Sequence, residues 1–256
     1  MRILVLTDNQ FLHESFRKIV KEWELADADF DYRFSPSNKE IRPSPDFFPL
    51  NVKTDSNQIV DTYNLVISLH CKQLFPPELV NRVRCVNVHP GYNPHNRGWY
   101  PQVFSIINKL PLGATIHEID VELDHGPIID QLEVPVYSWD TSLSAYERVL
   151  EAELHLLRKQ LKEIVQGTYD SHQLQEEGNI NFKKDFSNLC HLNLKEKTTV
   201  GGLIDRLRAT SHGDFRNSYF LDENGHRVYV RVILEKEDSD ATNDLLTARK
   251  VKPCRT

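Results

Sequence analysis

The feature that most constrains the fold is a regular alternation of short apolar runs and amphipathic stretches across residues 1–167. Strand-like runs occupy short segments spread over this region, namely residues 2–7, 30–35, 63–69, 84–89, 112–119 and 127–136. Helical stripes of apolar residues follow or separate them, over residues 11–23, 102–108 and 142–166. This alternation predicts an α/β domain, in which a mostly parallel twisted sheet is flanked by helices on both faces.

Polar composition and end signals mark the limits of these elements. Residues 36–60 are rich in Ser, Pro, Asn and Asp, and they predict a long surface loop. The long helix carries signals at both ends, because Ser144 and Glu147 have the spacing of a capping box and Gly167 suits a C-cap.

The region after residue 167 predicts a small appendage of one helix and one β-hairpin. Residues 168–196 are polar and indicate a loop. A short helix is predicted next by apolar residues at helical spacing, Val200, Leu203, Ile204 and Leu207. Asp222-Glu223-Asn224-Gly225 then separates two extended runs, which is typical of a hairpin. The sequence therefore predicts three regions. Residues 1–167 form a domain large enough to be catalytic, residues 168–235 form an appendage, and residues 236–256 form a disordered polar tail.

Composition excludes several classes of protein. The formal net charge of −6 argues against nonspecific binding to nucleic acid. No apolar run approaches the length of about 18 residues that a membrane span needs. The apolar start of the chain is too short for a signal peptide, and the four cysteines show no CxxC spacing. We expect a cytoplasmic protein with reduced cysteines and with neither a nucleic-acid nor a membrane partner.

Polar residues at the end of the 84–89 strand form the first candidate site. Side chains alternate along a strand, so Asn87 and His89 point to the same side while Val88 points into the sheet. Pro90 ends the strand, and ligands of open α/β sheets lie at the carboxyl ends of strands. Asp124 precedes the turn signal His-Gly-Pro, and this turn can bring its carboxylate to the same place.

An amide, an imidazole and a carboxylate together suit acyl transfer without a covalent intermediate. The amide and a protonated imidazole can donate to a developing oxyanion, and the carboxylate can hold the imidazole or accept a proton. No serine or cysteine lies beside them, so the nucleophile would come from a substrate. Each residue also has a structural interpretation: Asn87 as a strand-end cap, His89 as a buried packing residue and Asp124 as a turn former.

At these residues the sequence resembles the folate-dependent formyltransferases. Residues 87–90 read Asn-Val-His-Pro and residues 123–127 read Leu-Asp-His-Gly-Pro, the paired motifs of that family, and residues 113–117 fit as well. The resemblance covers about the first 140 residues and implies a Rossmann-like core. It implies that Asn87, His89 and Asp124 are catalytic and that 10-formyltetrahydrofolate is the donor. It also implies that the folate lies against two loops, represented by Lys72, Gln73 and Leu74 and by Ile119, Asp120 and Glu122.

The residues around the first motif point to one branch of the family. Residues 91–94 read Gly-Tyr-Asn-Pro, where the purine and methionyl-tRNA branches have Ser-Leu-Leu-Pro. Together with residues 70–73 and 96–101, this is similar to the sugar N-formyltransferases. That resemblance implies a nucleotide-linked amino sugar as acceptor, commonly dTDP-4-amino-4,6-dideoxyglucose, for bacterial O-antigen. The alternatives are another acceptor, including a purine precursor or methionyl-tRNA, and a non-catalytic nucleotide-sugar binding protein.

Candidates for acceptor binding lie in loops at the sheet edge and in the appendage, and they are Asn9, Asn93, Trp99, Tyr100 and Tyr219. The appendage aromatics can stack on a base, or they can belong to the hairpin core or to the contacts of a homodimer, which we also expect. Three histidines, His95, His117 and His125, lack the spacing of metal ligands, so no metal is expected.

Overall fold

The computed structural model describes residues 1–25 and 27–237, and most of the tail predicted over 236–256 lies outside the described residues. The elements in chain order are β1 (Arg2–Thr7), α1 (Gln10–Glu22), β2 (Asp29–Phe34), β3 (Phe47–Pro49), α2 (Ser56–Thr62), β4 (Leu65–Leu69), α3 (Pro77–Val80), β5 (Arg84–His89), β6 (Arg97–Gly98), α4 (Pro101–Asn108), β7 (Leu112–Glu118), β8 (Ile128–Val134), α5 (Ser142–Gln166), β9 (Ile180–Asn181), α6 (Lys183–Cys190), α7 (Val200–Thr210), β10 (Tyr219–Leu221) and β11 (Arg227–Tyr229).

A central seven-stranded sheet has the order β3-β2-β1-β4-β5-β7-β8. The strands from β3 to β5 are parallel, whereas β7 and β8 are antiparallel to their neighbours. The predicted mostly parallel sheet is confirmed. The antiparallel pairing of β5 with β7 sets Asn87 opposite His117 and His89 opposite Thr115, which brings a second histidine beside the candidate site.

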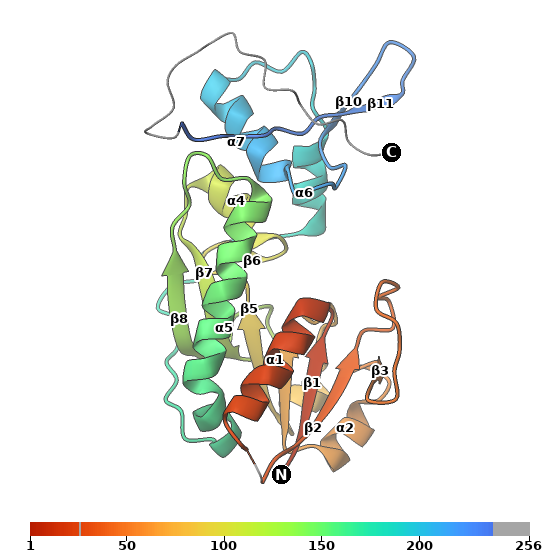
Figure 1. Cartoon of the computed structure of the whole chain (residues 1–256), viewed down its shortest axis with the longest axis vertical. Helices are drawn as coiled ribbons and strands as arrows, with labels where there is room; N and C mark the ends of the chain where they lie inside the picture. The colour runs from red at the N-terminus through yellow and green to blue at the C-terminus, as the bar shows by residue number, and fades with distance from the viewer. Residues whose placement is uncertain (26, 238–256) are drawn as a thin grey trace.

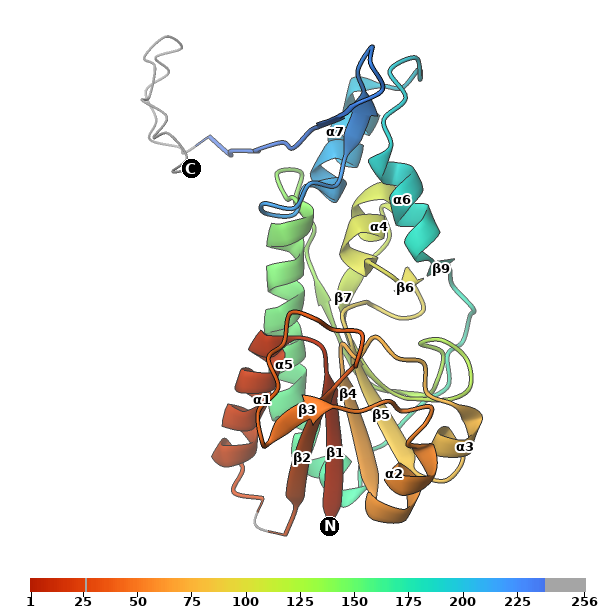
Figure 2. The ribbon, with the colours of Figure 1, turned by 90° about the vertical axis from the view of Figure 1, so that its right-hand side faces the viewer.

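Helices cover both faces of this sheet, as predicted (Figures 1 and 2). The alternation of β1 shows how: Ile3 and Val5 point into the core under α1 and α5, while Leu4 and Leu6 point into the core under α2 and α3. These side chains are fully buried. Because the strand is apolar on both faces, it fits only inside a sheet that is covered on both sides.

The long helix α5 has the predicted bounds but a different N-terminal cap. Its first residue is Ser142, so Thr141 is the N-cap and Ser144 stands at the third helical position, where the two exchange hydrogen bonds. The prediction that Ser144 and Glu147 form the capping box is therefore wrong. The box lies three residues earlier, at Thr141 and Ser144, because Ser144 is already inside the helix. Gly167 ends the helix with φ 71°, as its C-cap role predicts.

Two segments predicted as loops contain short elements. Within 36–60 lies the three-residue edge strand β3, and α2 begins at Ser56. Within 168–196 lie β9 and the eight-residue α6, which packs Phe186 and Leu189 against the α4 core. These elements present at most three apolar positions each, too few to produce a clear period in the sequence.

The C-terminal region lies beyond the carboxyl ends of the parallel strands, against α4 (Figures 1 and 2). It is joined to the first region by pairing of β6 with β9 and by packing of α7 on α4. The hairpin of β10 and β11 is present, as predicted. No helix within the described ranges is long and apolar enough to cross a membrane.

Candidate active site

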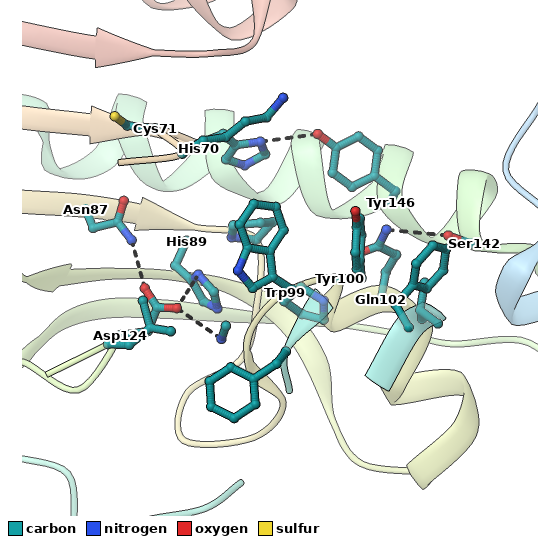
Figure 3. Close-up of a pocket in the computed structure, with 18 of the residues that line it drawn as sticks. His70, Cys71, Asn87, His89, Trp99, Tyr100, Gln102, Asp124, Ser142 and Tyr146 are labelled. Carbon is teal, nitrogen blue, oxygen red and sulfur yellow. Dashed lines mark hydrogen bonds and ion pairs between the residues drawn. The ribbon is translucent and has the colours of Figure 1, made fainter. Parts of the chain in front are cut away.

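A cavity of about 690 Å³ opens between the carboxyl ends of the central strands and the C-terminal region. Figure 3 shows how the side chains that line it approach from opposite walls. The lining draws on both regions of the chain, and its polar and aromatic members include His70, Asn87, His89, Trp99, Tyr100, Gln102, Asp124, Ser142, Tyr146, Phe182, His212 and Phe215.

The structure brings Asn87, His89 and Asp124 together at one end of this cavity (Figure 3). Asn87 Nδ2 lies 3.3 Å from Asp124 Oδ1, and His89 Nδ1 lies 3.5 Å from Asp124 Oδ2. Alternation along β5 aims the amide and the imidazole in one direction, and the turn residue Asp124, with φ 50°, faces both. The geometry that the motifs predict for these side chains is therefore present.

His89 is held out of water with one nitrogen free. The residue is only 4% exposed, and Nε2 has no hydrogen-bond partner among the described residues. Burial lowers the pKa of His89 to about 4, although Asp124 opposes the shift. The imidazole is thus neutral at pH 7. With Nδ1–H directed to Asp124, Nε2 keeps a lone pair that can accept a proton.

Gly91 makes room for this ring. A Cβ atom at Gly91 would lie 2.5 Å from His89 Nε2. Gly91 therefore has a local physical role in this chain, since a Cβ atom there would press on the free nitrogen.

Asp124 keeps its charge although its side chain is only 10% exposed. Burial alone would raise the pKa of Asp124, but His89, His117 and the backbone N–H of Gly98 together lower it to about 2. The Gly98 N–H donates to Oδ2 at 3.1 Å. The carboxylate is anionic at pH 7 and can orient the Nδ1–H of His89.

His117 is a site residue whose position sequence reasoning missed. Its Nδ1 lies 2.6 Å from the carbonyl oxygen of Glu118, so Nδ1–H donates there and Nε2 is left as an acceptor. Nε2 lies 3.2 Å from Asn87 Nδ2. Both amide hydrogens of Asn87 therefore have partners, at the long end of the hydrogen-bond range. The sequence signal for the position of His117 was the strand predicted after residue 112, which could pair with the strand that ends at His89.

Three of the six predicted folate contacts form one lip of the cavity, and the other three lie outside its lining. Lys72, Gln73 and Leu74 line the cavity, and Leu74 is 74% exposed. The Lys72 N–H already donates to Asp8 Oδ2 at 2.7 Å, while the Gln73 side chain bonds the backbone of Leu50 and Val52.

The second predicted folate loop lies beside the cavity. Ile119 donates its N–H to the carbonyl oxygen of Cys85, and Asp120 accepts the N–H of Glu122. None of the three lines the cavity, whereas Leu123 and Asp124, which follow directly, do.

The predicted acceptor residues divide into two groups. Trp99 and Tyr100 line the cavity. Asn9, Asn93 and Tyr219 lie outside its lining.

Each of these three has a structural partner instead. Asn9 caps α1 by accepting the N–H of Leu12, and Asn93 donates to the carbonyl oxygen of Asp124 at 2.8 Å. Tyr219 stacks on His191 within the hairpin region. The cap at Asn9 is a local contact, whereas the partners of Asn93 and Tyr219 lie 31 and 28 residues away in sequence.

The opposite wall of the cavity carries polar residues that the sequence reasoning did not select. Ser142 Oγ lies 3.1 Å from His212 Nδ1 and accepts from Gln102 Nε2 at 3.4 Å. Burial lowers the pKa of His212. These residues come from α5, the C-terminal region and α4, so only the tertiary fold brings them together.

Metal ligands do not gather anywhere in the described ranges: no group of three or more His, Cys, Asp or Glu side chains is arranged to hold an ion there.

Two family models match the chain: one for a formyl transferase domain covers residues 51–161, and one for an N-formyltransferase dimerization C-terminal domain covers residues 185–236. The chain is 47% identical over 237 residues to a dTDP-4-amino-4,6-dideoxyglucose formyltransferase of Mycobacterium tuberculosis, covering 93% of this chain and 98% of the relative.

The chain is also similar to solved structures of formyltransferases. A sugar N-formyltransferase from a Shewanella species is 47% identical with a TM-score of 0.89, over 93% of this chain and 99% of that one. A formyltransferase from Anoxybacillus kamchatkensis, in complex with UDP-4,6-dideoxy-4-formamido-L-AltNAc and tetrahydrofolate, is 25% identical with a TM-score of 0.56, over 73% of this chain and 89% of that one.

Proposed function

The chain belongs to the formyltransferase family, in its sugar N-formyltransferase branch, and on that premise we propose that it formylates dTDP-4-amino-4,6-dideoxyglucose with 10-formyltetrahydrofolate. The observation that carries the proposal is identity to the mycobacterial enzyme of that name along almost the whole of both chains. The geometry of Asn87, His89 and Asp124 at the cavity supports it.

The reaction follows from the protonation states of the three side chains. The neutral amine of the sugar attacks the formyl carbon, and a C–N bond forms as the carbonyl oxygen gains negative charge. Asn87 breaks one of its two long hydrogen bonds and donates that N–H to this oxyanion. His89 Nε2 takes the proton that the attacking nitrogen loses and passes it to N10 of the folate, whose bond to the formyl carbon breaks. Asp124 holds Nδ1–H of His89 throughout.

The two substrates approach from different sides of the trio. We assign the folate to the lip formed by residues 72–74 and to the loop at 119–124, which adjoins Asp124. The nucleotide then occupies the side covered by the C-terminal region. Trp99, Phe182 and Phe215 line the cavity there, with Phe182 and Phe215 53% and 64% exposed. Exposed aromatic rings are suited to stacking on a base, so these replace Tyr219 as the proposed base contacts.

The functional unit that we propose is a homodimer. The family model that covers residues 185–236 is a dimerization domain. The same region leaves large apolar side chains between 38% and 87% exposed, namely Val200, Leu203, Ile204, Leu221, Val228 and Ile233. A second copy would bury them.

Turnover with defined substrates tests the proposed function. Purified protein is incubated with 10-formyltetrahydrofolate and dTDP-4-amino-4,6-dideoxyglucose. Two quantities are measured over time, the amount of tetrahydrofolate released and the mass of the sugar nucleotide. We expect both products in equal amounts. The matched comparison is the dTDP-linked 3-amino isomer and the UDP-linked 4-amino sugar. Faster turnover of either would reassign the acceptor, and binding without turnover of any would favour a non-catalytic protein.

A further inference from the structure

A carboxylate is buried in the core of α5 beside the cavity. Glu153 is fully buried, between apolar positions of the helix that pack on the sheet. Its Oε1 lies 2.7 Å from His70 Nε2, and its Oε2 has no hydrogen-bond partner in the part of the chain that the structure describes. An isolated buried carboxylate is unfavourable, so its position among apolar side chains points to a function.

His70 links this carboxylate to the cavity. It follows directly on β4, lines the cavity and has φ 57°, a backbone conformation that non-glycine residues seldom adopt. Its second nitrogen, Nδ1, lies 3.2 Å from the hydroxyl oxygen of Tyr146. Tyr146 stands two helical turns before Glu153 on α5 and also lines the cavity (Figure 3). Carboxylate, imidazole and hydroxyl thus form one chain of hydrogen bonds.

The hydroxyl of Tyr146 has one acceptor position left for a ligand. Asn9 Nδ2 donates to this oxygen at 3.2 Å. When Nε2–H of His70 donates to Glu153, Nδ1 accepts the O–H of Tyr146. One lone pair of the oxygen is then free to accept from a donor in the cavity. An ammonium group is such a donor.

The catalytic trio cannot remove a proton from an ammonium group in the ground state. An aliphatic amine is largely protonated near neutral pH. Burial lowers the pKa of His89 to about 4, and that of Asp124 is about 2, so neither holds a proton that an ammonium has given up. The attacking amine must nevertheless be neutral.

We propose that Tyr146, His70 and Glu153 form a second proton relay, which removes a proton from the ammonium form of the acceptor before the amine attacks. This inference rests on the proposed function. The N–H bond of the ammonium breaks as its proton moves to the Tyr146 oxygen, and the Tyr146 proton moves to His70 Nδ1. After the product leaves, His70 returns this proton to solvent. The overall change is ammonium plus formyl-folate giving formamide, tetrahydrofolate and one proton.

The surroundings of the pair favour proton uptake. Neutral His70 beside an ionised Glu153 leaves one net negative charge in the core, and a proton makes the pair neutral. Burial raises the pKa of Glu153 while His70 opposes the shift, in agreement with this preference. Other titratable groups near the pair include Tyr146 on α5, His89 on β5, Cys71 and Lys72, which follow His70 in the cavity lining, and His212, whose ring centroid lies 5.7 Å from that of Tyr146.

The pH dependence of three variants tests the relay. Tyr146→Phe, Glu153→Gln and His70→Asn each interrupt it, and Asn tolerates the positive φ at position 70. We expect kcat/KM to fall about 10- to 100-fold at pH 6, a fraction of the usual effect of a general base. The loss should shrink to a few-fold at pH 9 or above, where the amine is already neutral. A loss of the same factor at every pH, or no loss, overturns the relay.

Control variants separate this outcome from loss of structure and from failure of the proposed function. Tyr137→Phe and Glu151→Gln change exposed residues outside the cavity lining, and their profiles should match the parent. Should Glu153→Gln not fold, Tyr146→Phe, which removes one oxygen at the cavity wall, gives the answer alone. An inactive parent protein refutes the proposed function, whereas active variants with parallel profiles refute only the relay.

Discussion

The His89 ring is set by three neighbours, with Asp124 holding Nδ1, Gly91 leaving space at Nε2 and β5 fixing its direction. Replacing His89 with Asn keeps a polar side chain but removes the proton acceptor. We expect kcat to fall about 100- to 1000-fold, while the affinity for folate stays the same. Steady-state kinetics measure both values. His95→Asn, a change outside the cavity lining, is the control. Near-parental turnover in folded His89→Asn would remove His89 from the mechanism.

The same histidine makes folding depend on pH. The folded protein keeps His89 neutral down to about pH 4, whereas the unfolded chain protonates it near pH 6.5. Between these values the unfolded state binds more protons, so the free energy of unfolding decreases as pH falls through this window. The slope from one such group is at most about 1.4 kcal/mol per pH unit.

Urea unfolding at pH 7, 6 and 5 measures this slope, and His89→Gln should flatten it. Glu153 contributes a slope of opposite sign above pH 4.5, because burial raises its pKa. The quantity to compare is therefore the difference between parent and variant in the pH slope of the free energy of unfolding. The contribution of Glu153 is the same in both proteins and cancels in this difference. Equal slopes in the two proteins would contradict the low pKa of His89.

Local sequence predicted the side chains that share one strand or one turn and missed those that tertiary pairing supplies. Asn87, His89 and Asp124 were predictable because alternation on one strand aims two of them and a turn motif marks the third. His117 is brought to Asn87 by antiparallel pairing across a separation of 30 residues. Glu153 reaches His70 across 83 residues. Inside an apolar helical stripe, a lone Glu carries no sequence signal for such a partner.

At the scale of elements, the start of α5 depends on its true N-cap. Thr141 accepts the N–H of Ser144, and the Ser144 hydroxyl accepts the N–H of Thr141 in return. Thr141→Ala should lower the free energy of unfolding by about 1 kcal/mol. Glu147→Ala, at the position expected from the sequence, should change it by a few tenths. Chemical denaturation compares the two, and a larger loss for Glu147→Ala would place the cap there instead.

Element length explains which elements were predictable. The strand β5 and the helix α5 were predicted with the bounds that the structure has, because each shows a full period of its pattern. The elements β3, α2, β9 and α6 were not predicted, since they form only where a neighbour supplies the missing contacts. β9 is two residues long and pairs with the equally short β6. Pairing of this kind fixes how the C-terminal region closes the cavity.

At the scale of the molecule, the strand order explains why two histidine systems share one cavity. β1, β4 and β5 are adjacent and parallel, so the residues after them, Asn9, His70 and the end of the His89 strand, emerge at one edge of the sheet. α5 crosses this edge and supplies Tyr146 and Glu153. The C-terminal region then covers the opening with Phe182, His212 and Phe215. The cavity lining therefore draws on both the first region and the C-terminal region.

That arrangement leads to a prediction that separates assembly from catalysis. Val200 and Ile204 on α7 are 77% and 43% exposed and lie outside the cavity lining. Introducing Val200→Glu together with Ile204→Glu places charges on the proposed dimer face, where burying them without partners is unfavourable. We expect a monomer by light scattering, with kcat within a few-fold of the parent because neither substituted residue lines the cavity. Lys195→Glu, an exposed change just before α7, should remain dimeric. A double variant that is still dimeric would move the interface elsewhere. A monomer without activity would show instead that the partner holds α7 and, through α4, the wall that carries Tyr100 and Gln102.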